Sequence, residues 1–257
     1  QAGRLLKFAA SYFGDDEIVL VITDITRLNS LEEMRKEFVG NVSHELRTPL
    51  TVMRGYIETL QDSPDNNAVV NRAFGQMADQ VNRMQALADD LILLSRLEAD
   101  GQKATLEPVN LQNLLTSIIV EAEILSGGLH SLSLDCAATL EVNSEGNSMR
   151  SALGNIIFNA VRHNPKGAVI DVVVEQYSDH ISISIQDDGV GIDPTEVPRL
   201  TERFYRGDSS RNSATGGTGL GLAIVKHSLN RCGGDLTISS RLGHGSRFVC
   251  RLPVVSA

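Results

Sequence analysis

The stretch Ser43-His44-Glu45-Leu46-Arg47-Thr48-Pro49 gathers an imidazole, a carboxylate and a hydroxyl within a few residues. These groups are the components of nucleophilic and acid–base sites. Pro49 has no backbone N–H, so the helical hydrogen bond that would end near Glu45 is missing and a bend is permitted. The stretch therefore predicts a reactive histidine at a locally weakened place in a helix.

The position of His44 on that helix places it in water. Apolar residues recur in alternating steps of three and four, as a buried helical seam requires. They are Leu28, Leu31, Met34, Phe38, Val42, Leu46, Leu50, Met53, Ile57 and Leu60. His44 lies between Val42 and Leu46, about 200° around the helix from Val42. A lone helical histidine usually has no chemical role, and only its neighbours Glu45, Thr48 and Pro49 favour one here.

Four polar or glycine-rich segments further along the chain can also carry chemistry. The first is one helical strip of Asn155, Asn159, Arg162 and His163, whose spacings of four, three and one put them on a narrow face. Amide oxygens can ligate a hard cation such as Mg²⁺, and arginine can hold phosphate oxygens. This strip is a candidate site for a metal-bound phosphate.

The other three segments are rich in glycine. Asp187-Asp188-Gly189-Val190-Gly191 follows a predicted strand, Gly216-Gly217-Thr218-Gly219-Leu220-Gly221 precedes a predicted helix, and Gly243-His244-Gly245 lies between strands. A carboxylate can accept from an exocyclic amine, and a loop at a helix N-terminus can cover phosphates. Each segment alone is more often a structural turn. The 216–221 loop lacks the Lys of a P-loop, and Leu222 replaces the third glycine of a dinucleotide fingerprint.

Two elongated helices are expected to carry the first of these features. The seam of residues 28–60 is followed by breakers at 61–67 and then by a second seam. Its members are Val70, Phe74, Met77, Val81, Met84, Ala88, Leu91, Leu94 and Leu97. An antiparallel hairpin buries such seams poorly alone, so we expect a homodimer with a four-helix bundle. Two strands before it, 5–13 and 18–23, are too few to form a domain.

After residues 101–108 the pattern changes to mixed helix and strand. Helices are expected at 111–125, 147–163 and 220–231, and strands at 131–142, 168–177, 180–186, 235–240 and 246–252. Short connections between consecutive strands indicate largely antiparallel pairing. The second domain is therefore expected to be an α/β sandwich with helices on one face of a mixed sheet.

Composition narrows the functional classes. The chain has 257 residues, 42% of them hydrophobic, which is enough for two domains with a core. Its net charge of −9 argues against nucleic acid or anionic lipid as the main partner, although such a charge is also typical of ordinary solubility, the interpretation that is favoured. Cys136, Cys232 and Cys250 form no metal-like or redox pair, so reduced thiols in a cytosolic compartment are expected. Because the chain begins at Gln1, we expect it to be a fragment.

Taken together, the His44 stretch and the glycine and asparagine segments resemble the sensor histidine kinases of two-component signalling. The resemblance covers residues 28–253 and includes that family's histidine, asparagine, aspartate-glycine, phenylalanine (202–206) and second glycine boxes. Within the family, residues 38–43 and 199–206 are most similar to the phosphate-regulon sensor kinases of proteobacteria. Asp24-Ile25-Thr26 is similar to the motif that ends PAS sensor domains.

The resemblance implies an α+β fold in four parts. Residues 1–26 would be the remnant of a PAS-like sensor domain, and 27–100 the dimeric helical hairpin for histidine phosphotransfer. Residues 101–110 would be a linker, and 111–257 the ATP-binding α/β sandwich of the histidine kinase, gyrase and chaperone type. The chain would then be the cytoplasmic portion of a bacterial inner-membrane protein, reaching the membrane only through a missing N-terminal part.

The resemblance also implies a mechanism with ATP and Mg²⁺ as cofactors. Asn159, with Asn155, would hold Mg²⁺ against the phosphates, and Asp187 would read the adenine amine. His44 would attack the γ-phosphorus while Glu45 accepts or orients the other ring proton. The phosphoryl group would pass to an aspartate of a response-regulator receiver domain, and Thr48 would position water for the reverse hydrolysis. The remaining nucleotide-binding residues would be Arg162, His163, Gly189, Gly191, Arg206, Gly217, Thr218, Gly219, Leu220 and Gly221.

One residue departs from the family pattern, and two alternative functions remain. His163 stands where the family most often has an aromatic ring against adenine, and an imidazole can also stack. A non-kinase ATPase of the same nucleotide fold is one alternative, which would have no need of the exposed His44. A non-catalytic dimeric relay is another, which would not need intact glycine and asparagine segments.

Overall fold

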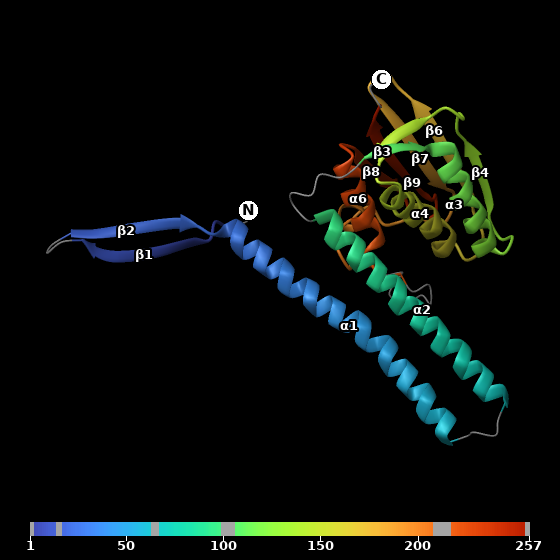
Figure 1. Cartoon of the computed structure of the whole chain (residues 1–257), viewed down its shortest axis with the longest axis horizontal. Coiled ribbons are helices and arrows are strands. Elements are labelled where there is room, and N and C mark those ends of the chain that lie inside the picture. Colours follow the sequence, from blue (N-terminus) through green and yellow to red (C-terminus); the bar gives the residue numbers. More distant parts are fainter. Residues whose placement is uncertain (1–2, 14–16, 63–66, 99–105, 208–216, 255–257) are drawn as a thin grey trace. The chain divides into compact units, whose positions relative to one another are not determined.

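A computed structural model describes residues 3–13, 17–62, 67–98, 106–207 and 217–254 (Figure 1). The chain divides into two compact units, Gln1–Val81 and Asn82–Ala257, and each is described by itself. The helix that carries the second seam crosses this division. None of the helices among the described residues has an apolar stretch long enough to cross a bilayer.

The first unit begins with an antiparallel hairpin of β1 (Leu6–Phe13) and β2 (Glu17–Asp24) (Figure 1). Both predicted strands are confirmed, with small shifts at their ends. Asp24 joins the hairpin to the next helix, because its carboxylate accepts from the backbone N–H of Thr26 at 2.9 Å. The Thr26 hydroxyl in turn accepts from Leu5 N at 2.8 Å. These contacts fix the Asp24-Ile25-Thr26 segment at the start of the helix.

Two long helices follow, as their seams predict. The first, α1 (Thr26–Asp62), has Pro49 in its interior, and the second, α2 (Asn67–Glu98), passes into the second unit. Several seam residues of α1 remain exposed in the single chain, among them Leu28, Met34, Leu50 and Ile57. An apolar helical face without a covering layer is the pattern of a surface that packs against another chain.

The second unit contains a five-stranded sheet in the order β4-β6-β7-β9-β8. Its strands are β4 (Ser131–Asp135), β6 (Val169–Gln176), β7 (His180–Asp187), β8 (Asp235–Ser240) and β9 (Ser246–Pro253). The β4–β6 pair is parallel and the others are antiparallel, so the predicted mixed and largely antiparallel sheet is confirmed.

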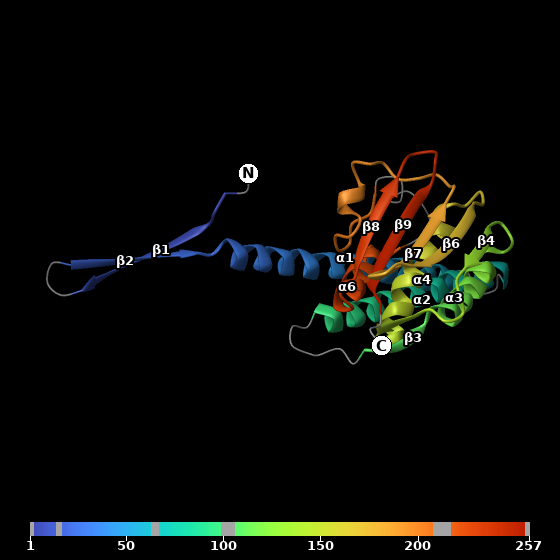
Figure 2. The same ribbon diagram turned by 90° about the horizontal axis from the view of Figure 1, so that it is seen from above.

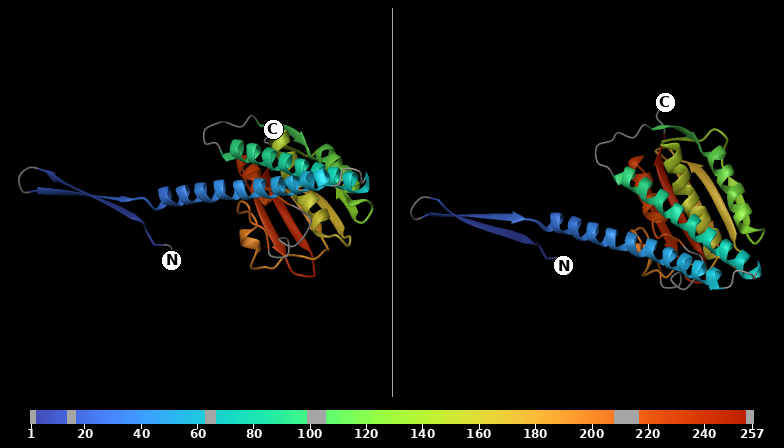
Figure 3. Two further views of the ribbon diagram at one scale, coloured as in Figure 1. Left: turned by 90° about the horizontal axis from the view of Figure 1, so that it is seen from below. Right: turned by 60° about the horizontal axis from the view of Figure 1, so that its bottom comes forward.

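Three helices cover one face of this sheet (Figures 2 and 3). They are α3 (Leu111–Ser126), α4 (Gly146–His163) and α6 (Gly221–Arg231). Alternation in β7 sends Ile181, Ile183 and Ile185 into the core, where all are at most 1% exposed. The face of the sheet away from the helices is mostly polar and includes Ser182, Arg247 and Arg251. This layering confirms the predicted α/β sandwich.

One predicted strand, residues 131–142, is wrong in its extent, because the structure divides it. The first part is β4 of the main sheet, whereas β5 (Glu141–Ser144) pairs with β3 (Glu107–Asn110) in a separate two-stranded sheet. The apolar alternation of β4 ends before Ala137, and the Asn110 side chain holds the turn by donating to Ala138 O at 2.8 Å. The same Asn110 caps α3 through Asn113 N. Part of the expected linker 101–110 is therefore a strand.

Candidate functional site

The candidate phospho-acceptor histidine lies on an exposed part of α1. His44 and Thr48 are exposed, Glu45 is half-buried, and Pro49 is buried. Thr48 Oγ1 donates to the main-chain carbonyl of His44 at 3.3 Å, one turn back. A proline that cannot donate and a hydroxyl that bonds to the preceding turn both favour a bend in a helix. The helix therefore presents His44 to solvent on a segment with a weakened hydrogen-bond ladder.

The polar strip of α4 lies where the sequence predicts it. Asn155 and Asn159 are half-buried, and within the described parts of the chain their side-chain amides make no hydrogen bond. A Cβ added at Gly221 would lie 2.8 Å from Asn155 Oδ1, so the first residue of α6 touches this strip. The structure thus brings the asparagine segment close to Gly221, with amide oxygens available to a ligand.

Asp187 is buried at the end of β7 and is 6% exposed. Its Oδ1 accepts from Gly189 N at 3.0 Å and from the side-chain amide of Asn164 at 3.2 Å. Burial raises the pKa of Asp187, although these hydrogen bonds oppose the shift. The adjacent Asp188 has a different task, since it accepts from Val169 N at 2.7 Å and ties β7 to β6. Of the two carboxylates, Asp187 is therefore the one suited to accept a hydrogen bond from a ligand.

The turn between β8 and β9 supports the loop that follows Asp187. Gly243 N donates to Val190 O at 2.8 Å, and Ile192 N donates to the Ser240 hydroxyl at 2.7 Å. The 243–245 segment therefore supports the chain between Gly189 and Gly191 through a main-chain hydrogen bond. Its predicted position between strands is confirmed, and its contacts indicate a structural task.

Gly219 and Phe204 form a constrained backbone contact near this site. Phe204 N donates to Gly219 O at 2.8 Å, and Phe204 has a positive φ of 61°. Gly219 has a φ of 72°, and a Cβ there would lie 2.8 Å from the Phe204 backbone, so only glycine fits. Leu220 is buried and is the residue that directly precedes α6. The glycine box and the phenylalanine box therefore meet, whereas Gly216 lies outside the described residues.

His163 is the last residue of α4 and its side chain is exposed. Desolvation lowers the pKa of His163 and the charges of Arg162 and Arg206 lower it further, whereas the charge of Asp187 raises it. The guanidinium of Arg162 lies 6.0 Å from the Phe158 ring centroid. An imidazole can stack on a flat base, and arginines can hold phosphate oxygens.

Comparison with known proteins places these features in one family. Residues 34–100 match the family described as the His Kinase A (phospho-acceptor) domain. Residues 144–256 match the family described as the histidine kinase-, DNA gyrase B- and HSP90-like ATPase. The chain belongs to the sensor histidine kinases. The non-kinase ATPase alternative is not favoured, because the chain also matches the phospho-acceptor domain.

Individual relatives agree with this assignment. This kinase is 49% identical over 247 residues to the phosphate regulon sensor protein PhoR of Pseudomonas aeruginosa, covering 95% of this chain and 56% of the relative. It is 34% identical to PhoR of Haemophilus influenzae, covering 97% and 59%. The chain thus spans little more than half the length of these curated relatives.

Solved structures share the fold. The Acinetobacter baumannii histidine kinase AdeS has a TM-score of 0.67 at 23% identity, covering 83% of this chain and 98% of AdeS. The histidine kinase ThkA, in a complex with the response regulator TrrA, has a TM-score of 0.68 at 18% identity, covering 98% of this chain and 79% of ThkA. At these identities the likeness concerns the fold alone.

The C-terminal part of α2 also contacts the loop that contains Thr218, a contact that the sequence did not predict. Thr218 donates its hydroxyl to Asp90 Oδ2 at 2.9 Å, and Glu98 pairs with Arg203 at 2.5 Å and with His227 at 3.3 Å. Burial raises the pKa of Asp90. The sequence feature that could have indicated this contact is Asp90, which lies on the same face of α2 as three leucines that are buried. These are Leu87, Leu94 and Leu97.

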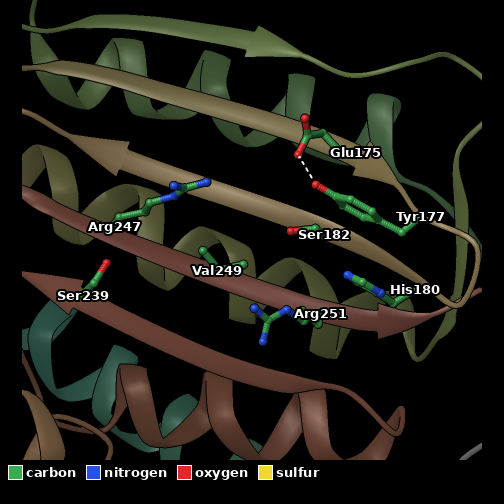
Figure 4. Close-up of a pocket in the computed structure, with 8 residues that line it drawn as sticks. All are labelled: Glu175, Tyr177, His180, Ser182, Ser239, Arg247, Val249 and Arg251. Atoms are coloured by element: carbon green, nitrogen blue, oxygen red, sulfur yellow. Dashed lines mark hydrogen bonds between the residues drawn. The ribbon is translucent and has the colours of Figure 1, made fainter.

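A hollow of about 590 Å³ lies on the other face of the kinase's sheet (Figure 4). Tyr177 stacks on His180 there, with ring centroids 4.7 Å apart, and donates to Glu175 at 2.9 Å. The remaining lining residues are Ser182, Ser239, Arg247, Val249 and Arg251. None of the predicted nucleotide-binding residues lines this hollow, so the two places are distinct.

Proposed function

We propose that this chain is the phosphotransfer and ATP-binding part of a sensor histidine kinase, and that His44 is the residue phosphorylated. The observation that carries the proposal is an exposed histidine on a proline-weakened helix in a chain that also has a nucleotide fold with converging amide, carboxylate and glycine segments. An ATPase clamp has no need of the exposed histidine, and a passive relay has no need of the nucleotide fold.

The acceptor chemistry follows from the residues around His44. The neutral imidazole attacks the γ-phosphorus through one nitrogen, and the bond from that phosphorus to the β-γ bridging oxygen breaks, releasing ADP. Glu45 accepts or orients the proton on the other nitrogen as positive charge develops on the ring. A phosphoramidate on His44 is the product. The exposure of His44 supports this role, because the acceptor has to reach a nucleotide bound on another unit.

The nucleotide chemistry follows from α4 and the loops around it. Asp187 accepts from the adenine amine, and His163 stacks on the base. Gly189 and Gly191 keep the loop after Asp187 close to the protein, because a Cβ at Gly189 would meet Asn164 Oδ1 and one at Gly191 would meet Arg241 O. The phosphate side would be formed by Arg162, Arg206, Gly217, Thr218, Gly219, Leu220 and Gly221. The half-buried amides of Asn159 and Asn155 would hold Mg²⁺, which is consistent with their oxygen donors having no hydrogen bond in the described chain. Mg²⁺, when bound, would neutralise phosphate charge.

The partners follow from the same reasoning. We propose that the exposed seam of α1 packs against a second copy in a four-helix bundle, and that a response-regulator receiver domain accepts the phosphoryl group on an aspartate. Thr48 then positions water for hydrolysis of that aspartyl phosphate. Similarity to PhoR supports the phosphate-regulon regulator as the partner. The hairpin of β1 and β2 would be the end of a PAS domain on the cytoplasmic side of a bacterial inner membrane.

The destination of the γ-phosphate of ATP distinguishes the proposed kinase from a simple ATPase. The protein is incubated with Mg²⁺ and ATP labelled on the γ-phosphate, and label on the chain is compared with free phosphate. We expect stoichiometric acid-labile, base-stable label on the chain, followed by rapid transfer to one receiver domain in a purified panel. Continuous release of free phosphate with no labelled chain would contradict it.

A further inference from the structure

Asn164 is a buried polar residue whose side-chain nitrogen and oxygen both form hydrogen bonds. It follows His163 at the end of α4 and is 4% exposed. Its Nδ2 donates to Ala160 O at 2.8 Å and to Asp187 Oδ1 at 3.2 Å. Its Oδ1 accepts from Val190 N at 2.9 Å. One amide therefore joins the asparagine helix to both the carboxylate and the loop of the aspartate-glycine segment.

We propose that Asn164 is the positioning residue that sets adenine specificity in this chain, by orienting the Asp187 carboxylate toward the base. The proposal rests on the proposed function, in which Asp187 reads the adenine amine. Both Asn164 Nδ2 and Gly189 N donate to Oδ1. Two donors on one oxygen fix the carboxylate plane and so determine the direction of Oδ2.

Packing leaves this amide no alternative position. A Cβ added at Gly189 would lie 1.8 Å from Asn164 Oδ1, so the side chain rests directly against the Gly189 backbone. Rotation of the amide would remove the acceptor from Val190 N and the donor from Asp187 together. Because burial disfavours the ionised form of Asp187, each donor to its carboxylate also helps to keep it charged.

The backbone of Asn164 is held separately from its side chain. The Asn164 carbonyl accepts from Gly167 N at 2.9 Å and from Nε2 of His130 at 2.9 Å. His130 is itself fixed by Ser126, whose hydroxyl lies 3.0 Å from Nδ1. Substitutions at position 164 therefore change the amide while these main-chain contacts remain. They can test orientation of Asp187 without removing the end of α4.

The test compares the dissociation constants of ATP and purine riboside triphosphate, which lacks the 6-amino group. We expect the unmodified chain to prefer ATP by roughly 10- to 100-fold, the cost of one lost hydrogen bond to a buried charge. Asn164→Asp keeps the shape and the acceptor for Val190 but removes the donor to Asp187. We expect the preference to fall to within about threefold, mainly through weaker ATP binding. Asn164→Ser should do the same without adding charge.

The controls separate this inference from the proposed function. Asn143→Asp makes the same charge change at an exposed position of β5 and should keep the preference. If the unmodified chain shows no preference, or Asp187→Ala retains it, adenine reading by Asp187 is wrong and the inference falls with it. If Asp187→Ala abolishes the preference while folded Asn164→Asp and Asn164→Ser keep it, only the role of Asn164 is overturned. Circular dichroism establishes folding of each variant.

Discussion

The hydroxyl of Thr48 donates to the main-chain carbonyl of His44 at 3.3 Å, so the residue proposed for the phosphatase step is bonded to the backbone of the acceptor. This bond uses the hydroxyl proton and leaves the oxygen able to accept from water. The same bond is also what a purely structural threonine would make in a weakened helix. Kinetics can distinguish the two roles.

Thr48→Ala should lower dephosphorylation of the regulator by roughly 10²- to 10³-fold, the typical effect of losing one positioned hydrogen bond, and spare most autophosphorylation. Thr51→Ala is a matched control, because Thr51 is also exposed and donates to Arg47 O at 3.0 Å. Both activities are measured on each variant. A parallel decline in the Thr48 variant would show that the residue only braces the helix.

Asn159→Ala should abolish Mg²⁺-dependent nucleotide binding, because the amide oxygen it removes has no substitute at that position of α4. Calorimetry with and without Mg²⁺ measures the effect, with Asn155→Ala measured beside it. Unchanged Mg-ATP affinity in Asn159→Ala, together with a loss in Asn155→Ala, would move the metal site to Asn155.

Nucleotide affinity should depend on pH through Asp187. Burial raises the pKa of this carboxyl, and the ionised form is the stronger acceptor for the adenine amine, so ATP affinity should fall with acidification at a higher pH than for an ordinary aspartate. The raised pKa also means that Asp187 contributes stability at low pH, which is lost as the pH rises through its folded value. Titrations of ATP binding across pH, in the unmodified chain and in Asp187→Asn, measure this acid dependence. An identical acid dependence in the variant would exclude Asp187 as its source.

A fragment of residues 28–97 should form a dimer, because the exposed residues of the α1 seam need an apolar partner. Sedimentation at micromolar concentration measures its mass. Leu50→Glu, which places a charge on the exposed seam, should produce monomers, whereas Arg54→Glu on the exposed Arg54–Glu58 pair should not. Monomeric behaviour of the unmodified fragment would refute the bundle.

Periodicity could predict most elements of this fold, because a seam such as that of α1 or the alternation of β7 is local to one segment. It could not predict that residues 131–142 divide between two sheets, since the turn is held by Asn110 from a preceding strand. The order of the glycine segments indicated the nucleotide site, although their contacts, such as Phe204 with Gly219, depend on the tertiary fold. Asn164 was missed because an asparagine before a proline is typical of a helix end, and its bond to Asp187 joins residues far apart in sequence.

The most direct measurement of the central claim is covalent phosphate on His44 after incubation with Mg²⁺ and γ-labelled ATP. His44→Gln should carry no acid-labile phosphate while its ATP affinity, measured by calorimetry, remains that of the unmodified chain, because the acceptor and the nucleotide-binding residues belong to different units. His180→Gln, on the far face of the sheet, should label normally. Acid-labile phosphate retained on His44→Gln would contradict the assignment of His44 as the phospho-acceptor.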